Sequence, residues 1–262
     1  MHASQLKASR GWNDLDDQKS KVPASKCYSP PDNISTVMLS DALEDTGRFP
    51  EKRQMSFLEK QAADRAIADM KLYFTGDLSL LKRPCVAIVG TRQVSDAGRL
   101  RTQRLARELV KAGVVVVSGL AYGVDAVAHQ TAIDSGGSTI AVLGTPLDRA
   151  SPSENAPLQE EIYRRHLLLS QFEVGEPTFR TNFPLRNKLM ATIADATVVM
   201  EASDTSGTLH QAAACTKLGR WLFIARSVVD DSKLTWPTNF LKYETCVPLD
   251  KVSDITSRIA NR

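Results

Sequence analysis

Three apolar runs in the sequence each end in a glycine that is followed by polar residues suited to phosphate. The first run, VAIV, leads into Gly90, Thr91 and Arg92, and similar runs end at Gly119 and Gly144. Gly90 allows a ligand to approach the backbone, Thr91 offers a hydroxyl, and Arg92 offers a planar guanidinium. An ordinary strand-to-helix turn with a solvated arginine explains this motif equally well. Together the three runs predict strand ends that bind a nucleotide or a nucleic-acid backbone.

The second of these loops holds an acidic residue and a histidine at helical spacing. Gly119 and Gly123 stand four residues apart, which lets the loop fold tightly before a helix. Asp125 can cap that helix, and His129 follows one turn later on the same face. The two side chains could form a catalytic pair or brace the loop. We favour the brace, because no nucleophile stands at a suitable spacing.

A third motif, NFPLRNK, combines an aromatic residue with two cations. Phe183 can stack on an unpaired base while Arg186 and Lys188 meet the phosphates of a single strand. The alternative places Phe183 in the core and the cations on a solvated helix face. We favour nucleic-acid binding, because the two cations flank the polar Asn187 at a predicted helix start.

A fourth motif follows the apolar run that ends at Met200. Ser206, Gly207 and Thr208 form a turn before a predicted helix, and the hydroxyl and N–H groups of such a turn bind anions. Glu201 could accept a hydrogen bond from a hydroxyl or an exocyclic amine. Ordinary helix capping remains an equal alternative for this motif.

Charge is distributed unevenly in this chain of 262 residues, whose net charge is only +3. A polyanion would therefore have to bind at a local cluster of cations. Such a cluster lies between residues 82 and 111, where Asp96 and Glu108 oppose Lys82, Arg83, Arg92, Arg99, Arg101, Arg104, Arg107 and Lys111. A solubilising helix face explains part of this cluster.

Alternating apolar and amphipathic segments predict an α/β fold, a doubly wound and mostly parallel sheet. We expect strands at 86–89, 114–118, 139–143, 167–172, 196–200 and 221–225. We expect helices at about 97–111, 124–135, 155–166, 184–194 and 206–218. Ligands of such sheets bind beyond the carboxyl ends of the strands, where the glycine-ended runs converge.

The composition of the chain and the positions of its prolines suggest how it is divided into segments. We expect a poorly ordered tail at 1–35, a small helical extension at 36–70, and the main domain at 71–262. The four cysteines form no Cys-x-x-Cys pair, so neither zinc nor a disulfide framework is expected. The sequence holds no apolar stretch long enough to cross a membrane and no signal-like start, so we expect a cytoplasmic protein with reduced thiols.

The ordered set of motifs resembles the DNA-processing protein A family, also called DprA or Smf. The resemblance covers about residues 70–240 and includes VAIVGTR, SGLAYGVD, AVLGT, NFPLRNK and the SGTL that follows Glu201-Ala202. It implies an extended Rossmann-like fold and single-stranded DNA binding without catalysis or a cofactor. It further implies a homodimer that protects incoming DNA in natural transformation and loads a RecA-type recombinase.

Carried over by motif, Arg92, Arg186 and Lys188 would contact phosphates and Phe183 would lie beside the strand. The glycines and Ser118 would shape the pocket. The residues that we expect to bind DNA are Gly90, Thr91, Arg92, Ser118, Gly119, Gly123, Phe183, Arg186, Asn187, Lys188, Glu201, Ser206, Gly207 and Thr208. The sequence departs from the family pattern at Lys188, which replaces an arginine, and at His210-Gln211, which replace Ile-Thr.

Two other functions fit the same predicted pocket. A nucleotide-sensing module, of a kind found in phage defence, would hold one nucleotide there. A nucleoside monophosphate phosphoribohydrolase would need a carboxylate near Gln211, and an amide cannot serve as a general acid or base. We rank the enzyme last.

Overall fold

The computed structural model describes residues 28–48 and 70–260 of the chain. They form a single nine-stranded sheet. The strands are β1 (Ser35–Met38), β2 (Lys71–Gly76), β3 (Cys85–Val89), β4 (Val115–Ser118), β5 (Thr139–Leu143), β6 (Leu167–Ser170), β7 (Ala196–Val199), β8 (Trp221–Ala225) and β9 (Cys246–Leu249). Their spatial order is β1-β2-β6-β5-β4-β3-β7-β8-β9. The pairings of β1 with β2 and of β2 with β6 are antiparallel, and the other pairings are parallel.

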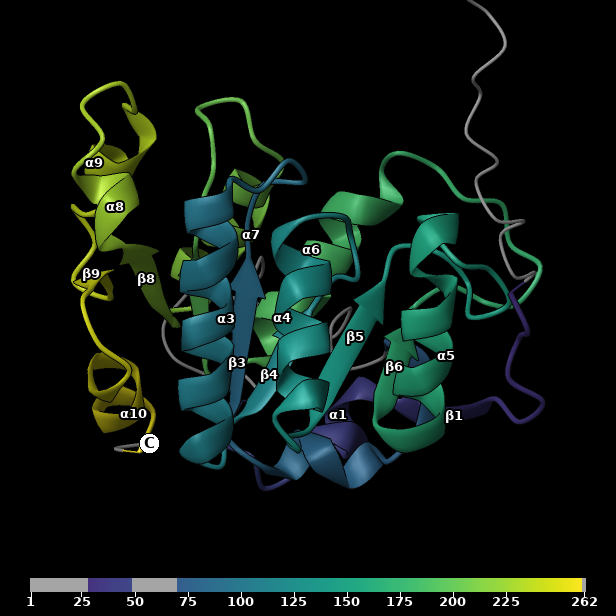
Figure 1. The fold of residues 1–262 in the computed structure, drawn as a ribbon. Helices are drawn as coiled ribbons and strands as arrows, with labels where there is room; N and C mark the ends of the chain where they lie inside the picture. The colour runs from purple at the N-terminus through teal and green to yellow at the C-terminus, as the bar shows by residue number, and fades with distance from the viewer. Residues whose placement is uncertain (1–27, 49–69, 261–262) are drawn as a thin grey trace, which may run out of the picture.

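Helices cover both faces of this sheet. The helices are α1 (Leu39–Ala42), α3 (Asp96–Lys111), α4 (Val124–Asp134), α5 (Ala156–Arg165), α6 (Asn182–Ile193), α7 (Thr208–Lys217), α8 (Arg226–Val229), α9 (Trp236–Phe240) and α10 (Ser253–Ile259). Figure 1 shows α3, α4 and α5 in front of the strands, with α6 and α7 behind them. This is the predicted mostly parallel, extended Rossmann-like α/β fold, which is confirmed.

The strand order reverses between β3 and β7. From β3 the chain winds through β4, β5 and β6 toward one edge, and from β7 it winds through β8 and β9 toward the other. The loops that follow β3 and β7 therefore diverge to opposite faces and leave a crevice between them. This reversal is the place where sheets of this type bind ligands.

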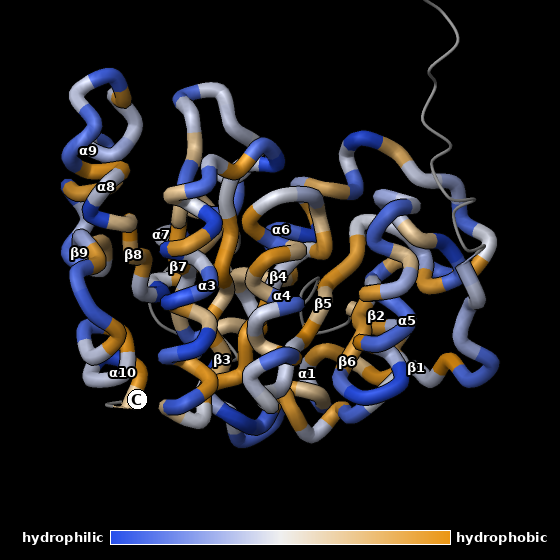
Figure 2. The backbone as a smooth tube through the Cα atoms, viewed as in Figure 1, coloured by the Kyte–Doolittle hydropathy of each residue, from blue (hydrophilic) through white to orange (hydrophobic). Residues whose placement is uncertain are grey.

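The central strands form because they are apolar along their whole length. Every residue of β3 and β5 is buried, as parallel strands between two helical layers require. Figure 2 shows this hydrophobic centre, with hydrophilic residues concentrated on the outer helices and loops. Ser95 caps helix α3, because its side chain accepts a hydrogen bond from the Gly98 N–H at 3.0 Å.

The amino-terminal segment differs from its prediction. Residues 36–38, expected to be helical, join residue 35 of the expected tail in the edge strand β1, because all four pair in register with β2. Tyr28, within the expected tail, donates its hydroxyl to the Leu147 carbonyl at 2.7 Å, so the packed chain begins before residue 36. Within the expected helical segment, Leu39–Ala42 form the helix α1. The expectations for 1–27 and 49–69 fall outside the described residues.

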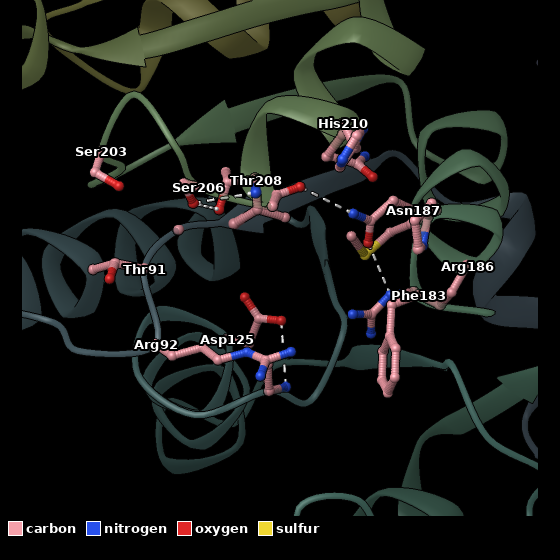
Figure 3. A pocket seen from close by; sticks show the side chains of 17 residues that line it. Thr91, Arg92, Asp125, Phe183, Arg186, Asn187, Ser203, Ser206, Thr208 and His210 are labelled. Atoms are coloured by element: carbon pink, nitrogen blue, oxygen red, sulfur yellow. Dashed lines mark hydrogen bonds between the residues drawn. The ribbon is translucent and has the colours of Figure 1, made fainter. Parts of the chain in front are cut away.

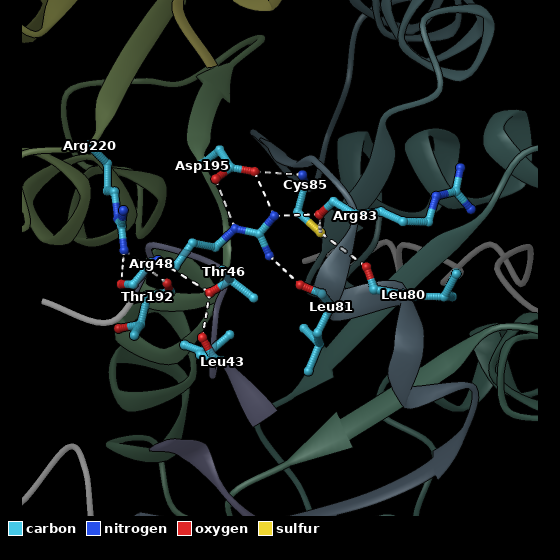
Figure 4. A network of polar contacts seen from close by, with 10 residues as sticks. All are labelled: Leu43, Thr46, Arg48, Leu80, Leu81, Arg83, Cys85, Thr192, Asp195 and Arg220. Atoms are coloured by element: carbon cyan, nitrogen blue, oxygen red, sulfur yellow. Dashed lines mark hydrogen bonds and ion pairs between the residues drawn. The ribbon is translucent and has the colours of Figure 1, made fainter. Parts of the chain in front are cut away.

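A buried ion pair attaches the end of the amino-terminal segment to the sheet. Arg48 contacts the Asp195 carboxylate through two bonds of 2.8 and 2.7 Å, and it donates to the carbonyl groups of Leu81 and Arg83. Asp195 also accepts the Cys85 N–H at 2.8 Å. Figure 4 shows this network, at the end of the sheet opposite the crevice. Within the described part of the chain, the helices are too short or too polar to cross a membrane.

Candidate nucleic-acid interface

A cavity of about 350 Å³ opens at the strand reversal. The loop after β3 contributes Thr91 and Arg92, helix α6 contributes Phe183, Arg186 and Asn187, and the turn before α7 contributes Ser206, Gly207 and Thr208. Figure 3 shows these side chains around one hollow, although they come from three separate segments of the sequence. The structure therefore brings most of the predicted site residues together.

A second cavity, of about 560 Å³, continues the first toward the ends of β4 and β5. The two share Arg92, Ala121, Phe183 and Arg186, so they form one continuous depression, which we call the rim groove. Arg180 adds a third arginine on the side of the second cavity. The only carboxylate that lines either described cavity is that of Asp125. The groove is therefore cationic and suits a polyanion.

Arg92 is an exposed cation of the groove. Its loop is fixed on both sides, because the Thr91 N–H donates to the Glu201 carbonyl at 2.7 Å and the Val124 N–H donates to the Thr91 carbonyl at 3.2 Å. Gly123 has φ +73°, and a side chain there would overlap the carbonyl groups of Thr91 and Arg92. Gly123 thus brings two loops together, which agrees with the tight fold that we expected of this loop.

Arg186 has a different role from the one predicted. It is buried, and its Nη1 donates to the carbonyl oxygens of Gly119 and Val142, the second at 2.8 Å. Its Nε donates to the Asn187 side chain at 2.9 Å. Arg186 therefore forms the floor of the groove and joins α6 to the ends of β4 and β5. It contributes positive charge from below, with most of its donors used inside the protein.

Asp125 braces the loop between β4 and α4, as predicted. Its carboxylate accepts the N–H groups of Gly119 at 3.2 Å and Ala121 at 3.3 Å. Burial raises the pKa of Asp125, and the nearby Arg186 guanidinium opposes that rise. His129 does not pair with Asp125; its Nδ1 lies 2.7 Å from the Thr139 hydroxyl instead. The catalytic alternative for Asp125 and His129 has no geometric support.

The turn before α7 closes the other wall of the groove. The Ser206 hydroxyl contacts the Thr208 hydroxyl at 2.9 Å and accepts the Thr208 N–H at 3.2 Å. A Cβ added at Gly207 would meet no atom within 4 Å, so open space faces this residue. Helix α7 directs its amino-terminal end at the cavity, where its dipole favours an anion.

Two predicted site residues are engaged elsewhere. Glu201 directs its carboxylate to the amino-terminal end of α3, where it accepts the Ser95 hydroxyl at 2.9 Å, and it does not line the described groove. The Ser118 hydroxyl is buried and donates to the Ile88 carbonyl at 2.6 Å. Both side chains hold neighbouring segments in place, which is their contribution to the groove.

The face of α6 explains which residues of the third motif reach the groove. The residues of α6 that line it are Phe183, Pro184, Arg186, Asn187 and Met190, and all but Pro184 are spaced as one helical face. Lys188 is exposed but is absent from the lining of the described groove. We had predicted that Lys188 and Arg92 would contact phosphates together. Of these two cations, Arg92 alone lines the described groove. Phe183 is half-buried, with its ring packed over Gly144.

Sequence reasoning missed several residues that line the groove. Arg180 precedes the NFPLRNK motif and was overlooked because an isolated arginine in a loop carries no pattern. Tyr122 stands in the second loop and is 40% exposed, and His210 follows the turn before α7. The basic cluster of 82–111 lies largely on α3, and of its members Arg92 alone lines the described groove.

Comparisons of sequence agree with the motifs. A family model for DNA recombination-mediator protein A matches residues 49–260. Protein Smf of Synechocystis sp. is 43% identical over 156 residues, which are 58% of this chain and 39% of that protein. The DNA processing protein DprA of Streptococcus pneumoniae is 40% identical over 164 residues, 62% of this chain and 58% of that protein. The matched part thus spans between 39% and 58% of these two relatives.

Comparisons of structure agree with the fold. The X-ray structure of DprA from Streptococcus pneumoniae superposes with a TM-score of 0.70 and 31% identity, covering 86% of this chain and 74% of that one. DprA from Helicobacter pylori, whose structure was described for its single-stranded DNA binding mode, superposes with a TM-score of 0.69 and 26% identity, covering 87% and 96%. The chain belongs to the DNA recombination-mediator protein A family, the DprA/Smf proteins.

Proposed function

We propose that this protein binds single-stranded DNA in the rim groove. The observation that carries the proposal is the continuity of the two cavities, which share Arg92, Ala121, Phe183 and Arg186. A nucleotide fills one cavity, whereas a groove of two joined cavities suits a chain of phosphates. Phe183 and Tyr122 provide rings for unpaired bases, and Arg92 and Arg180 provide exposed cations for the backbone.

We further propose the role that the family resemblance implies. The protein would act in the cytoplasm as a homodimer, protect incoming strands in natural transformation, and load a RecA-type recombinase on them. Binding without catalysis agrees with Gln211, which is buried and whose amide contacts the Thr197 hydroxyl at 3.2 Å. An amide held in this way supplies no proton-transfer group for an enzyme of the phosphoribohydrolase type.

Titrations with labelled DNA test the binding proposal. Fluorescence anisotropy should show tighter binding to a single strand of about 16 nucleotides than to the matching duplex. Arg92→Ala should weaken binding across all sequences and lower the slope of log affinity against log salt by about 0.7. Arg104→Ala is the matched control, because Arg104 is exposed on α3 and pairs with Glu108 away from the groove.

Two outcomes would overturn the proposal. Absence of binding to any single strand at low salt would exclude DNA as the ligand. Saturable binding of one free nucleotide, without affinity for oligonucleotides, would instead identify a nucleotide sensor. The recombinase proposal has its own test, in which the protein should raise DNA-dependent ATP hydrolysis by RecA on single strands already covered by a single-strand-binding protein.

A further inference from the structure

The loop between β4 and α4 separates the rim groove from a third cavity of a different chemical character. This third cavity, of about 420 Å³, lies among α3, α4 and the start of α5. Tyr122 lines both the third cavity and the groove, so its side chain stands at the boundary between them. With 40% of its surface exposed, Tyr122 offers its ring to a ligand at this boundary.

The wall of the third cavity combines amide and apolar side chains with three charged residues, Arg99, Asp134 and Glu154. The amides of Gln103, Gln130 and Asn155 lie in its wall, beside apolar groups such as Val127 and Leu158. We call this cavity the amide pocket. Amides both donate and accept hydrogen bonds, and the apolar side chains beside them suit the face of a ring. Such a lining suits a flat, neutral, polar ring.

The charges around the amide pocket oppose a phosphate. Arg99 is its one described cation, against the carboxylates of Asp134 and Glu154. Asp134 accepts the Gln130 amide at 2.9 Å. A hydrogen bond from the Tyr122 hydroxyl lowers the pKa of Glu154, so this carboxylate is ionised at neutral pH. The phosphates of a bound strand therefore belong in the rim groove, with its three arginines.

The loop that carries Tyr122 is held rigidly in place. Asn155 Nδ2 donates to the Leu120 carbonyl at 2.8 Å and to the Ala121 carbonyl at 3.3 Å. Asp125 binds two N–H groups of the same loop. Leu120 is buried and has φ +57°, a conformation that a leucine adopts only where its surroundings enforce it. A ring presented from such a loop loses little freedom when it binds.

We propose that the amide pocket receives one unstacked base of a strand whose phosphates lie in the rim groove, with that base stacked on Tyr122. This inference rests on the proposed function. The Gln103 amide and the side-chain oxygens of Gln130 and Asn155 would bind the edge of the base, because the Nδ2 of Asn155 is already bonded to the loop. The ring of Tyr122 would cover the face of the base. A base within a duplex is paired and stacked, so it cannot turn out into the pocket without cost. The pocket would thus favour single strands over duplexes.

The test combines substitution of Tyr122 with removal of single bases from the DNA. An abasic site is moved along a labelled oligonucleotide, and at one position wild-type affinity should fall roughly 5- to 100-fold. Tyr122→Ala should lose the same factor with the intact strand and should not respond to the abasic site. Its salt slope should equal that of the wild type, whereas Arg92→Ala gives a shallower slope.

Two further variants separate stacking from general damage. Tyr122→Phe keeps the ring, loses the hydroxyl bond to Glu154, and should restore most of the affinity that Tyr122→Ala loses. Tyr243→Ala removes another exposed tyrosine, 54% accessible and outside both the groove and the amide pocket, and should also bind normally. Thermal unfolding of each variant establishes that it is folded.

The possible failures are distinguishable. If Tyr122→Ala binds every oligonucleotide as the wild type does while Arg92→Ala binds weakly, the base pocket is wrong and the DNA-binding function stands. If Tyr122→Phe loses as much affinity as Tyr122→Ala, the hydroxyl rather than the ring is responsible, and stacking is refuted. If the wild type binds no oligonucleotide, the proposed function itself fails.

Discussion

Gly119 and Arg186 are in direct contact, since the carbonyl of Gly119 accepts a hydrogen bond from Arg186 Nη1 and a Cβ on Gly119 would overlap the guanidinium. The arginine cannot retreat easily, because it is buried and also bound to the Val142 carbonyl. Gly119→Ala should therefore lower the free energy of unfolding by about 1–3 kcal/mol. Urea unfolding followed by circular dichroism measures this loss.

Gly207→Ala is the matched control for that substitution. Gly207 also borders the groove, but its added Cβ would meet no atom within 4 Å and its φ is −58°. The free energy of unfolding of Gly207→Ala should remain within about 0.5 kcal/mol of the wild-type value. Equal losses in both variants would show that the contact between Gly119 and Arg186 is not the cause.

Arg48 should be the most sensitive position at the opposite end of the sheet. Its ion pair with Asp195 is almost fully buried, with side-chain exposures of 3% and 7%. Arg48→Met would leave a buried carboxylate without its guanidinium, and we expect a loss of about 3–5 kcal/mol in the free energy of unfolding. Chemical denaturation of the full chain provides the measurement.

A surface ion pair supplies the comparison for Arg48. Arg226 and Asp250 lie 2.6 Å apart, with side-chain exposures of 47% and 54%. Arg226→Met should cost at most about 1 kcal/mol, because water already solvates both charges. The interpretation of Arg48 would be contradicted if the two substitutions had similar effects.

The central strands could be predicted from the sequence, because the apolar residues that cause their burial form continuous runs in it. Strands such as β3 and β5 are short apolar runs, and only burial on both faces explains such runs. The edge strands escaped this reasoning. β1 is half exposed and β9 contains Pro248, so neither shows an apolar run, and both depend on a neighbouring strand for their conformation.

The sequence predicted which types of residue gather at the candidate site better than it predicted the direction in which each side chain points. Glycines, hydroxyls and arginines at strand ends do converge, because parallel strands direct their carboxyl ends to one edge. The sequence could not show that Arg186 is buried beneath the groove, since that depends on the carbonyl groups of Gly119 and Val142. The helical spacing of Phe183 and Asn187 did contain the information that Lys188 faces elsewhere.

His129 should make stability depend on pH. Burial lowers the pKa of its imidazole to about 3, whereas the unfolded chain has the ordinary value near 6.5. The unfolded state therefore takes up the proton first, and stability falls as pH drops below about 6.5, with a slope of at most about 1.4 kcal/mol per unit. His129→Gln should be less stable than the wild type at neutral pH, because the buried contact with Thr139 is altered.

The difference in unfolding free energy between the wild type and His129→Gln is the quantity that tests this prediction. Unfolding free energies measured between about pH 7 and pH 5 should converge as the pH falls, because only the wild type loses the contribution of this imidazole. His166 is also partly buried, and burial lowers its pKa, so it adds a similar slope to both proteins and cancels in the difference. If the difference in unfolding free energy stayed constant with pH, the pH dependence could not be assigned to His129.

Arg180 and Lys188 allow the course of the DNA to be tested with two exposed cations of one segment. Arg180 lines the rim groove, whereas Lys188 lies about 100° around α6 from Asn187, away from the lining face. Arg180→Ala should weaken binding of a labelled single strand and lower the salt slope by about 0.7, because one phosphate contact is lost. Lys188→Ala should change neither quantity measurably. Equal losses in the two variants would mean that the strand also crosses the outer face of α6, and the groove would then be only part of its path.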